Sequence, residues 1–388
     1  MNALKLDLLI FGGGIAGLWT LLRARQAGYR ALLLESAVLG GMQSIASQGI
    51  IHGGAKYALK GGVTASARAI ADMPGIWRDA LAGKGDVDLS AARVLSPHQH
   101  LWSSGGIGSS LAGVFASKLM QSRVSPLAKA QFPPPFDAPG FRGSLYELQE
   151  PVLDTASLMR AMTEQARPAC YRYDPEKLQI EDGSLQIGQL RLEPRRVLLA
   201  AGEGNAGLLQ HWGVEHPQMQ KRPLHMVMLK GRLPAVYAHC LGASSNPRLT
   251  ITSYPLEASG MIWYLGGQLA EEGVGRDPMQ QIKAAKSELA KLLPWMDFSA
   301  VSYATLEIQR AEAATPGLKR PHDCYLGVEK HLLVAWPTKL AFAPRLADLV
   351  MQQLKQDGLM PGAGELPPLS LPHPALARLP WEQVATWS

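Results

Sequence analysis

Apolar and polar residues follow a strand–helix–strand order at the beginning of the chain. Residues 8–11 form a short apolar run, residues 18–27 have a helical pattern closed by Gly28, and residues 31–34 form a second apolar run. Short apolar runs of this kind are typical of strands that are buried on both faces of a parallel sheet. The pattern therefore predicts two parallel strands joined by a helix.

A glycine motif lies between the first predicted strand and the helix. Gly12, Gly14 and Gly17 have the spacing Gly-x-Gly-x-x-Gly. Gly12 would make the tight turn, Gly14 would let the backbone approach a pyrophosphate, and Gly17 would let the helix pack close to the strand. The first N–H groups of the helix would then face the phosphates, because this end of a helix is electropositive. Glu35 ends the second strand, where it can accept the hydroxyls of an adenosine ribose, so the segment predicts a bound dinucleotide.

Further along the chain, the pattern predicts a second sheet inserted into the first fold. Residues 196–202 form another apolar run that suits a buried parallel strand. Antiparallel alternation is found at residues 225–232, 249–254 and 261–265. A strand at 332–336 and a helix at 340–354 return to the first pattern, which implies that the first and last segments share one nucleotide-binding domain.

Helices and short strands are predicted in the intervening segments. Helices are expected at residues 64–82, 108–121 and 277–293, and one capped by Asp154 or Thr155 ends at Ala166. Short strands are expected at residues 169–173, 177–181 and 185–192.

Composition narrows the class of protein. The chain has 388 residues with 47% hydrophobic and 18% charged residues, which is typical of a globular protein large enough for two domains. A net charge of +6 without a basic run does not indicate a nucleic-acid-binding protein. The three cysteines form no close pair, so a reduced compartment is expected and a cysteine-based zinc site is not. No stretch suggests a signal peptide or a membrane-spanning helix, and we expect a cytoplasmic protein that could lie at the inner membrane surface.

Five segments together resemble the FAD-dependent superfamily that contains amino-acid oxidases and glycerol-3-phosphate dehydrogenases. Besides the glycine motif, residues 47–57 are similar to the Ser-x-x-Ile-His-Gly-Gly-x-Arg-Tyr segment of the glycerol-3-phosphate branch. Residues 197–202 are similar to the strand that passes beneath FAD. Residues 315–321 are similar to the Gly-x-Arg-Pro segment that places an arginine over the substrate, and residues 334–345 to the closing Gly-Gly-Lys-x-Thr segment under the flavin ring.

The chain departs from the family pattern at several positions. Position 56 is Lys instead of Arg, the 315–321 segment has an extra residue, and the closing segment reads Trp336-Pro337-Thr338-Lys339. The large C-terminal helical domain of the respiratory glycerol-3-phosphate enzymes is absent. These departures leave FAD binding as the expectation but put the identity of the substrate in doubt.

The resemblance implies an α/β fold that is α+β overall, with a Rossmann-like FAD-binding domain of GR2 type interleaved with an antiparallel-sheet substrate domain. The FAD-binding domain would comprise residues 1–82, 150–215 and 325–360, and the substrate domain residues 83–149 and 216–324. Residues 361–388 would form a Pro-rich tail. Noncovalent FAD would contact Gly12, Gly14, Ile15, Ala16, Gly17, Glu35, Ser36, Gly41, Ser44, Ser47, Gln48, Gly49, Lys177, Ala201, Gly202, Thr338, Lys339 and Leu340.

Oxidation by hydride transfer needs a base, anchors for the substrate and a positive charge near the reduced flavin. His52 is the candidate base, with a structural histidine as the alternative. Lys56 and Arg320 are candidate anchors for a carboxylate or phosphate. For Arg310 a solvated surface charge is the preferred interpretation. Lys339 is expected under the pyrimidine edge of the flavin, at the start of the last helix.

Several aromatic and histidine residues are open to more than one interpretation. His98 and His100 lack a third ligand pattern, so no metal site is predicted, and with Trp102 they are expected to line the substrate cavity or a lid. Other aromatic residues could supply cavity walls, although their spacing is more typical of core: Trp263, Tyr264 and Trp336.

The sequence therefore predicts an FAD-dependent oxidoreductase that oxidises a small anionic hydroxy or amino compound, such as glycerol-3-phosphate, a 2-hydroxy acid or an amino acid. The electron acceptor is left open between oxygen, a quinone and a protein. One alternative is an FAD-dependent amine oxidase of a biosynthetic pathway. Another is a flavin-bound RNA-modification or assembly factor. A nicotinamide-only dehydrogenase is disfavoured, because it leaves residues 47–57 and 334–345 unexplained.

Overall fold

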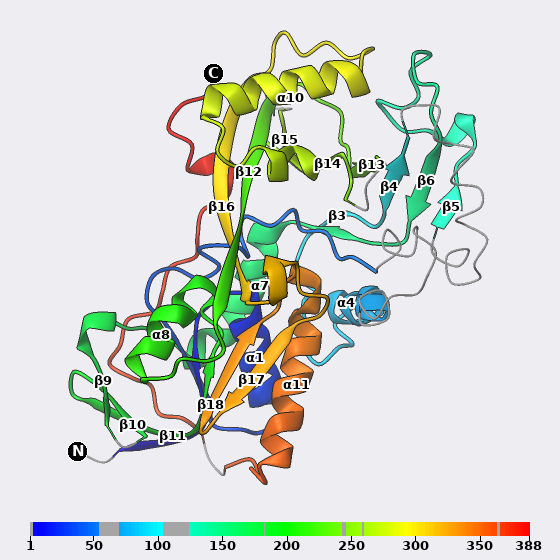
Figure 1. Ribbon diagram of the computed structural model, residues 1–388. Coiled ribbons are helices and arrows are strands. Elements are labelled where there is room, and N and C mark those ends of the chain that lie inside the picture. Colours follow the sequence, from blue (N-terminus) through cyan, green and yellow to red (C-terminus); the bar gives the residue numbers. More distant parts are fainter. Residues whose placement is uncertain are drawn as a thin grey trace.

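The computed structural model describes residues 3–53, 70–103, 124–181, 183–242, 246–257, 260–362 and 365–388. Figure 1 shows a lower part, in which strands are flanked by helices, and an upper part built on long antiparallel strands. Each part has its own sheet, and the candidate site depends on how the two sheets meet. Within the described ranges, no helix combines the length and apolar character needed to cross a membrane.

The first sheet contains the nucleotide-binding pattern. Its main order is β17-β18-β11-β1-β2-β8. These strands are β17 (Tyr325–Glu329), β18 (Leu332–Trp336), β11 (Leu190–Leu199), β1 (Leu4–Phe11), β2 (Ala31–Glu35) and β8 (Cys170–Arg172). β1 pairs in parallel with both β2 and β11, and β11 pairs in parallel with β18. The first and last segments therefore share one sheet, as predicted.

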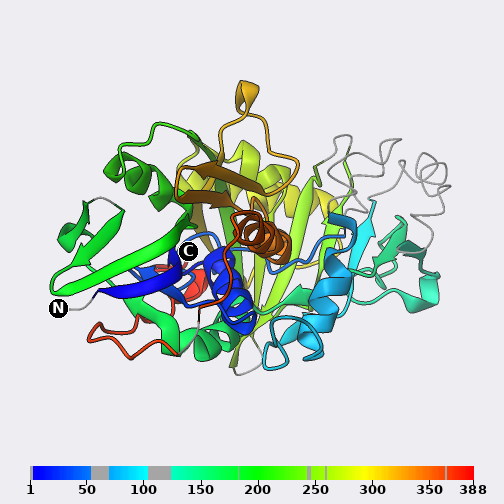
Figure 2. The same ribbon diagram turned by 90° about the horizontal axis from the view of Figure 1, so that it is seen from below.

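Helices cover one face of this sheet, and alternate side chains of β1 explain why. Leu8 and Ile10 pack into a core with the helices, whereas Leu9 and Phe11 pack into a second core on the opposite face. The helices are α1 (Ile15–Gln26), α4 (Met73–Leu81), α7 (Thr155–Ala166) and α11 (Ala343–Gln356). Figure 2 shows α1 and α11 side by side, in agreement with their contacts. The strand is buried on both faces, as its apolar run predicted.

The second sheet is mostly antiparallel and has the order β16-β12-β15-β14-β13-β4-β6-β5. Its strands are β16 (Ser302–Ala313), β12 (Met219–Gly231), β15 (Met261–Gly266), β14 (Leu249–Pro255), β13 (Ala238–Cys240), β4 (Gln99–Trp102), β6 (Leu145–Leu148) and β5 (Val124–Pro126). The strands predicted at 225–232, 249–254 and 261–265 are thus confirmed. The predicted domain boundaries stay a prediction, although the two sheets draw their strands from separate segments.

Two long strands join the sheets. β12 and β16 pair over their whole length, from Met219 opposite Ala313 to Lys230 opposite Ser302. At one end Ala313 packs into the core of the first sheet, and at the other Tyr303 packs into the core of the second. Figure 1 shows this ribbon running between the two parts. A pocket beside the middle of the ribbon can therefore receive side chains from both sheets.

The remaining elements are short or flank the two sheets. The remaining helices are α8 (Asn205–His211), α9 (Gln268–Glu272) and α10 (Pro278–Leu292), and α10 covers the upper sheet in Figure 1. The other strands are β3 (Val94–Ser96), β7 (Val152–Leu153), β9 (Leu178–Glu181) and β10 (Ser184–Ile187). Single 3-10 turns occur at Lys129–Gln131, Arg167–Ala169, Pro175–Lys177, Gly202–Gly204, Pro316–Leu318, Leu340–Phe342 and Pro380–Glu382.

Element boundaries show which local predictions hold. Asp154 caps α7 by accepting from the backbone N–H groups of Ala156 and Ser157, as predicted. The single strand predicted at 185–192 is wrong, because Gly188 adopts a φ of 59° and turns the chain between β10 and β11. The helix predicted at 108–121 and residues 64–69 of another lie outside the described residues.

The Pro-rich segment after residue 360 packs against both sheets. The backbone of Leu39, after β2, donates to Ala375 O and accepts from Ala377 N, at 2.8 and 3.0 Å. Farther along, Trp381 packs on Tyr254 with ring centroids 4.4 Å apart. The segment is therefore part of the folded structure and contributes to both cores.

Candidate functional site

The three motif glycines have different surroundings. Gly12 adopts a φ of 108°, and a Cβ there would lie 2.5 Å from the Cα of Ala201. A Cβ at Gly17 would collide with the carbonyl oxygen of Gly12, where the helix meets the strand. A Cβ at Gly14 would meet only the hydroxyl of Ser44, at 3.2 Å. Gly12 and Gly17 are thus required by packing, whereas Gly14 borders open space.

Backbone donors at this turn are available to a ligand. Among the described residues, the N–H groups of Gly14, Ala16 and Gly17 have no protein acceptor, while that of Ile15 donates to Ser44 Oγ at 2.9 Å. Free donors at a helix N-terminus favour an anion. The turn therefore fits the pyrophosphate of a dinucleotide.

The adenosine side of the expected cofactor site lies at the end of β2. The carboxylate of Glu35 accepts from Gly13 N at 2.6 Å and from Ala37 N at 2.8 Å, so it is held beside the glycine turn. Ser36 and Lys177 line one hollow at the same end of the sheet. The predicted residues Glu35, Ser36 and Lys177 are thus brought together.

Residues after the strand β11 lie on the other side of the turn. Ala201 N donates to Asn205 Oδ1 at 2.8 Å, and the carbonyl of Gly202 accepts from the Trp336 indole at 2.9 Å. Gly202 has a φ of 59°, and a Cβ there would meet nothing within 4 Å. Ala201 also supplies the backbone against which Gly12 packs.

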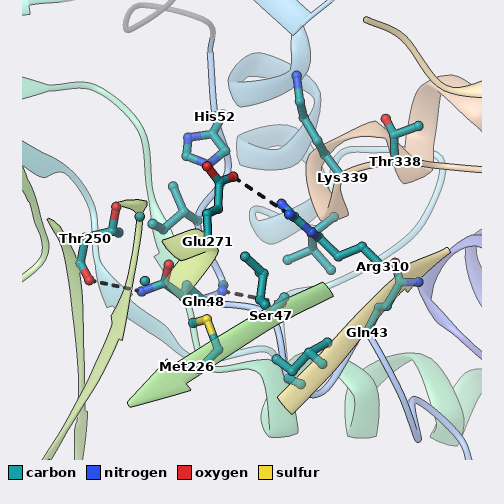
Figure 3. Close-up of a pocket in the computed structure, with 18 of the residues that line it drawn as sticks. Gln43, Ser47, Gln48, His52, Met226, Thr250, Glu271, Arg310, Thr338 and Lys339 are labelled. Atoms are coloured by element: carbon teal, nitrogen blue, oxygen red, sulfur yellow. Dashed lines mark hydrogen bonds and ion pairs between the residues drawn. The ribbon is translucent and has the colours of Figure 1, made fainter. Parts of the chain in front are cut away.

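A pocket extends from the glycine turn into the space between the two sheets (Figure 3). Ten predicted site residues line it: Ile15, Ser44, Ser47, Gln48, Gly49, His52, Arg320, Thr338, Lys339 and Leu340. Gly41 lies outside this lining and packs on Val38. Lys56 and Tyr57 lie outside the described residues.

The segment around Gln48 attaches the pocket wall to the second sheet. Gln48 Nε2 donates to the carbonyl of Tyr264 at 2.9 Å and to Thr252 Oγ1 at 3.3 Å. Gly49 adopts a φ of 67°, and a Cβ there would collide with the carbonyl oxygen of Leu153. The amide nitrogen of Gln48 is therefore bonded to the second sheet, and Gly49 is required by close packing.

His52 belongs to a cluster of polar residues that the sequence did not reveal. Its Nδ1 lies 3.6 Å from Oε2 of Glu150, a buried carboxylate. Glu150 also accepts from Gly53 N at 2.6 Å and from Gln99 Nε2 at 2.7 Å. The His239 ring stacks on His52, with centroids 5.7 Å apart. A carboxylate therefore lies beside the imidazole of His52 on its Nδ1 side.

Arg310 faces the pocket instead of solvent, so the preferred interpretation from sequence was wrong. Its guanidinium lies 3.7 Å from Glu271, as Figure 3 shows, and Nε donates to the carbonyl of Arg222 at 3.0 Å. Burial, followed by the charges of Arg222 and Arg320, lowers the pKa of Arg310 to about 10. Long-range register explains the error: Arg310 lies opposite Arg222 in the long β12–β16 ribbon.

The neighbouring charges are unevenly paired. Arg222 donates two hydrogen bonds to Glu312, at 2.7 and 2.8 Å, so the charges of these two side chains neutralise each other. In the described part of the chain, the buried Nε of Arg320 has no hydrogen-bond partner. Glu271 is shared, since it also accepts from Asn246 at 2.8 Å. The pocket thus has guanidinium donors that the protein does not fully satisfy.

In the closing segment, a non-glycine residue adopts a backbone conformation that is typical of glycine. Thr338 adopts a φ of 57°, in the left-handed region that favours glycine. Its hydroxyl donates to the backbone carbonyl of Asp323 at 3.3 Å. The carboxylate of Asp323 accepts from Arg345 Nε at 2.8 Å. Lys339 is 9% exposed, and its ammonium lies 4.9 Å from the centre of the Phe342 ring.

The histidine and aromatic residues that had more than one interpretation from sequence lie outside the pocket lining. His98, His100 and Trp102 do not line it, and Trp102 is fully buried in the core of the second sheet, so the cavity expectation is wrong. Fully buried core positions are also found for Trp263, Tyr264 and Trp336.

The pattern of fold and site matches a known class of flavoenzyme. The family model described as "FAD dependent oxidoreductase" (DAO) matches residues 7–303, and the chain belongs to this family. The protein is therefore an oxidoreductase that uses FAD.

Individual relatives support the same assignment. The chain is 48% identical over 386 residues to the probable FAD-dependent oxidoreductase PA4991 of Pseudomonas aeruginosa, with 98% of each chain covered. The crystal structure of PA4991 superposes with a TM-score of 0.85, at 42% identity, covering 98% of this chain and 99% of that one.

More distant structures share the fold. The glycine oxidase of Geobacillus kaustophilus has a TM-score of 0.63 at 15% identity, with 91% of this chain and 95% of that one covered. The L-alpha-glycerophosphate oxidase of Mycoplasma pneumoniae, with FAD bound, has a TM-score of 0.62 at 12% identity, with 92% and 95% covered. The predicted fold class is confirmed.

Proposed function

We propose that this enzyme oxidises a small compound that bears a carboxylate and an amino group, with a 2-hydroxy acid as the second candidate. The supporting observation is the charge of the described pocket lining. Two guanidinium groups, those of Arg310 and Arg320, line the pocket together with one carboxylate, Glu271. Such a site favours an anionic ligand.

Arg310 and Arg320 would bind the carboxylate of the substrate. The lowered pKa of Arg310 reflects burial and the repulsion of neighbouring guanidinium groups. A bound anion would relieve that repulsion and supply an acceptor to the Arg320 Nε. A planar guanidinium can hold a carboxylate with two hydrogen bonds, which fixes the orientation of the substrate.

Glu271 favours an amino substrate over a hydroxy substrate. Its bond to Asn246 would keep the carboxylate in place when the anion of the substrate engages Arg310. A carboxylate fixed in this way can accept hydrogen bonds from an ammonium group but would repel a second anion. The same argument disfavours a phosphate that carries two negative charges close to Glu271.

His52 would take the proton from the amino or hydroxyl group of the substrate. Glu150 would hold the ring and stabilise the imidazolium that forms. When bound, FAD accepts a hydride from the substrate carbon, which is the chemistry that this cofactor supplies. Lys339 would stabilise negative charge at the pyrimidine edge of the cofactor.

The predicted cofactor contacts are part of the same proposal. Free N–H groups at Gly14 and Ala16 would hold the pyrophosphate, Glu35 the ribose, and residues 44–49 would run beside the flavin. The electron acceptor, whether oxygen, a quinone or a protein, lies outside the proposal.

The test is an anaerobic substrate screen that follows the visible flavin absorbance. Amino acids and simple amines would be compared with the matching 2-hydroxy acids and with glycerol-3-phosphate. Bleaching by an amino acid but not by its hydroxy analogue is expected, and bleaching by glycerol-3-phosphate alone would contradict the proposal. Arg320→Met should raise the apparent substrate constant, whereas the control Arg191→Met, at an exposed position, should not.

A further inference from the structure

A second group of potential ligand atoms lies on the antiparallel sheet, outside the lining of the candidate pocket. His100 of β4 is the register partner of Glu147 of β6. Side chains of directly paired residues lie on the same face of a sheet, about 5 Å apart. His98 precedes His100 by two residues, and its backbone carbonyl accepts from the hydroxyl of Ser96. The fold thus brings three metal-binding side chains to one spot.

The three side chains are close enough to share one ion. Nε2 of His98 lies 3.5 Å from Oε2 of Glu147, and the two imidazole rings are 5.2 Å apart and nearly perpendicular. One ligand atom from each residue lies within 4.8 Å of the other two. Gln149 donates to Oε1 of Glu147 at 2.9 Å, which orients the carboxylate and leaves Oε2 toward His98.

His100 is the most buried of the three side chains. The residue is only 9% exposed, and one of its ring nitrogens is among the three ligand atoms that lie within 4.8 Å of one another. A largely buried imidazole beside a second imidazole and a carboxylate is an arrangement of donors that a metal ion can complete.

We propose that His98, His100 and Glu147 bind a zinc ion, with a fourth position left to water. Two imidazole nitrogens and one carboxylate oxygen are a donor set that suits zinc. The side chains of His98 and Glu147 are 34% and 24% exposed, so they can move to the shorter distances that coordination needs. The ion would link β6 to β4 and to the residues that precede β4.

The site has a structural role, because none of its ligands lines the pocket between the two sheets. The His98–Glu147 ion pair involves only two of the three residues. A metal ion instead accounts for all three residues, and it would stabilise the outer strands of the second sheet by binding only to the folded chain.

The test is a zinc titration of the full FAD-loaded chain, after treatment with a chelator and removal of the chelator. Isothermal titration calorimetry should give one Zn²⁺ per chain, and zinc should raise the melting temperature. His98→Gln and Glu147→Gln should each weaken binding at least tenfold without changing FAD content. The control His216→Gln, at an exposed histidine outside the group, should bind zinc as the wild type does.

Two results would overturn the proposal. One is the absence of zinc binding by the wild-type chain. The other is binding that is equally tight in His98→Gln and Glu147→Gln, which would place the ion elsewhere. Since both positions are partly exposed, the variants are expected to fold, and retained FAD and an unchanged melting temperature without zinc would verify this.

Discussion

Gly14 and Gly17 allow cofactor binding to be separated from folding. Both belong to one motif, but a Cβ at Gly14 would meet only the Ser44 hydroxyl, at 3.2 Å, while one at Gly17 would collide with the backbone of Gly12. Gly14 also has a φ of −77° and a ψ of −178°, which valine adopts without strain. Gly14→Val should therefore fold, and Gly17→Val should not.

The size of the effect on FAD follows from the donors at the turn. The valine side chain would keep the pyrophosphate away from the N–H groups of Gly14 and Ala16, which have no protein acceptor among the described residues. Losing two hydrogen bonds to a charged group costs about 3 to 6 kcal/mol, which raises the dissociation constant of FAD roughly 10²- to 10⁴-fold. The cost to folding should stay near 1 kcal/mol, because the only close neighbour is the Ser44 hydroxyl.

Two measurements on the same samples check this prediction. Fluorescence titration of the apo chain with FAD gives the dissociation constant, and thermal melting of the apo chain gives the stability. Wild-type FAD affinity in Gly14→Val would refute the placement of the pyrophosphate. An apo chain of Gly14→Val that melts as poorly as Gly17→Val would refute the separation of the two roles.

Further predictions concern the flavin environment. Lys339→Met should lower the reduction potential of the bound flavin by about 30 mV if the lysine contributes about 1.4 kcal/mol. Arg320→Met and Lys56→Met should instead raise the apparent substrate constant and leave the potential unchanged. Redox titration measures the potential, and steady-state kinetics measure the substrate constant. The opposite pattern would refute the assignment of roles. The flavin should be released by acid precipitation, because no covalent link is expected; colour kept in the pellet would show otherwise. Burial raises the pKa of the Cys324 thiol to about 12, so at pH 8 it should stay protonated and react with iodoacetamide far more slowly than in the denatured chain; mass spectrometry of the native protein checks this.

Local patterns were sufficient wherever one segment determines its own structure. The continuous apolar run around Leu9 predicted a strand buried on both faces, and the glycine spacing predicted a turn in which Gly17 is required by packing. Asp154 caps its helix through donors only two and three residues away. Such features depend on backbone geometry over a few residues, so the sequence carries them directly.

The tertiary structure decided the contacts between residues far apart in the chain. Glu150 meets His52 across 98 positions, and Glu271 meets Arg310 across 39. Nothing in the local sequence marks either carboxylate, because sheet register determines which side chains face each other. Thr338 illustrates the same limit. This β-branched residue adopts a glycine-like backbone conformation that its own preference opposes, and its hydroxyl is hydrogen-bonded to Asp323, which lies 15 positions away. The sequence alone was thus enough for the fold and the cofactor, whereas the charges that select a substrate depend on how two sheets pack.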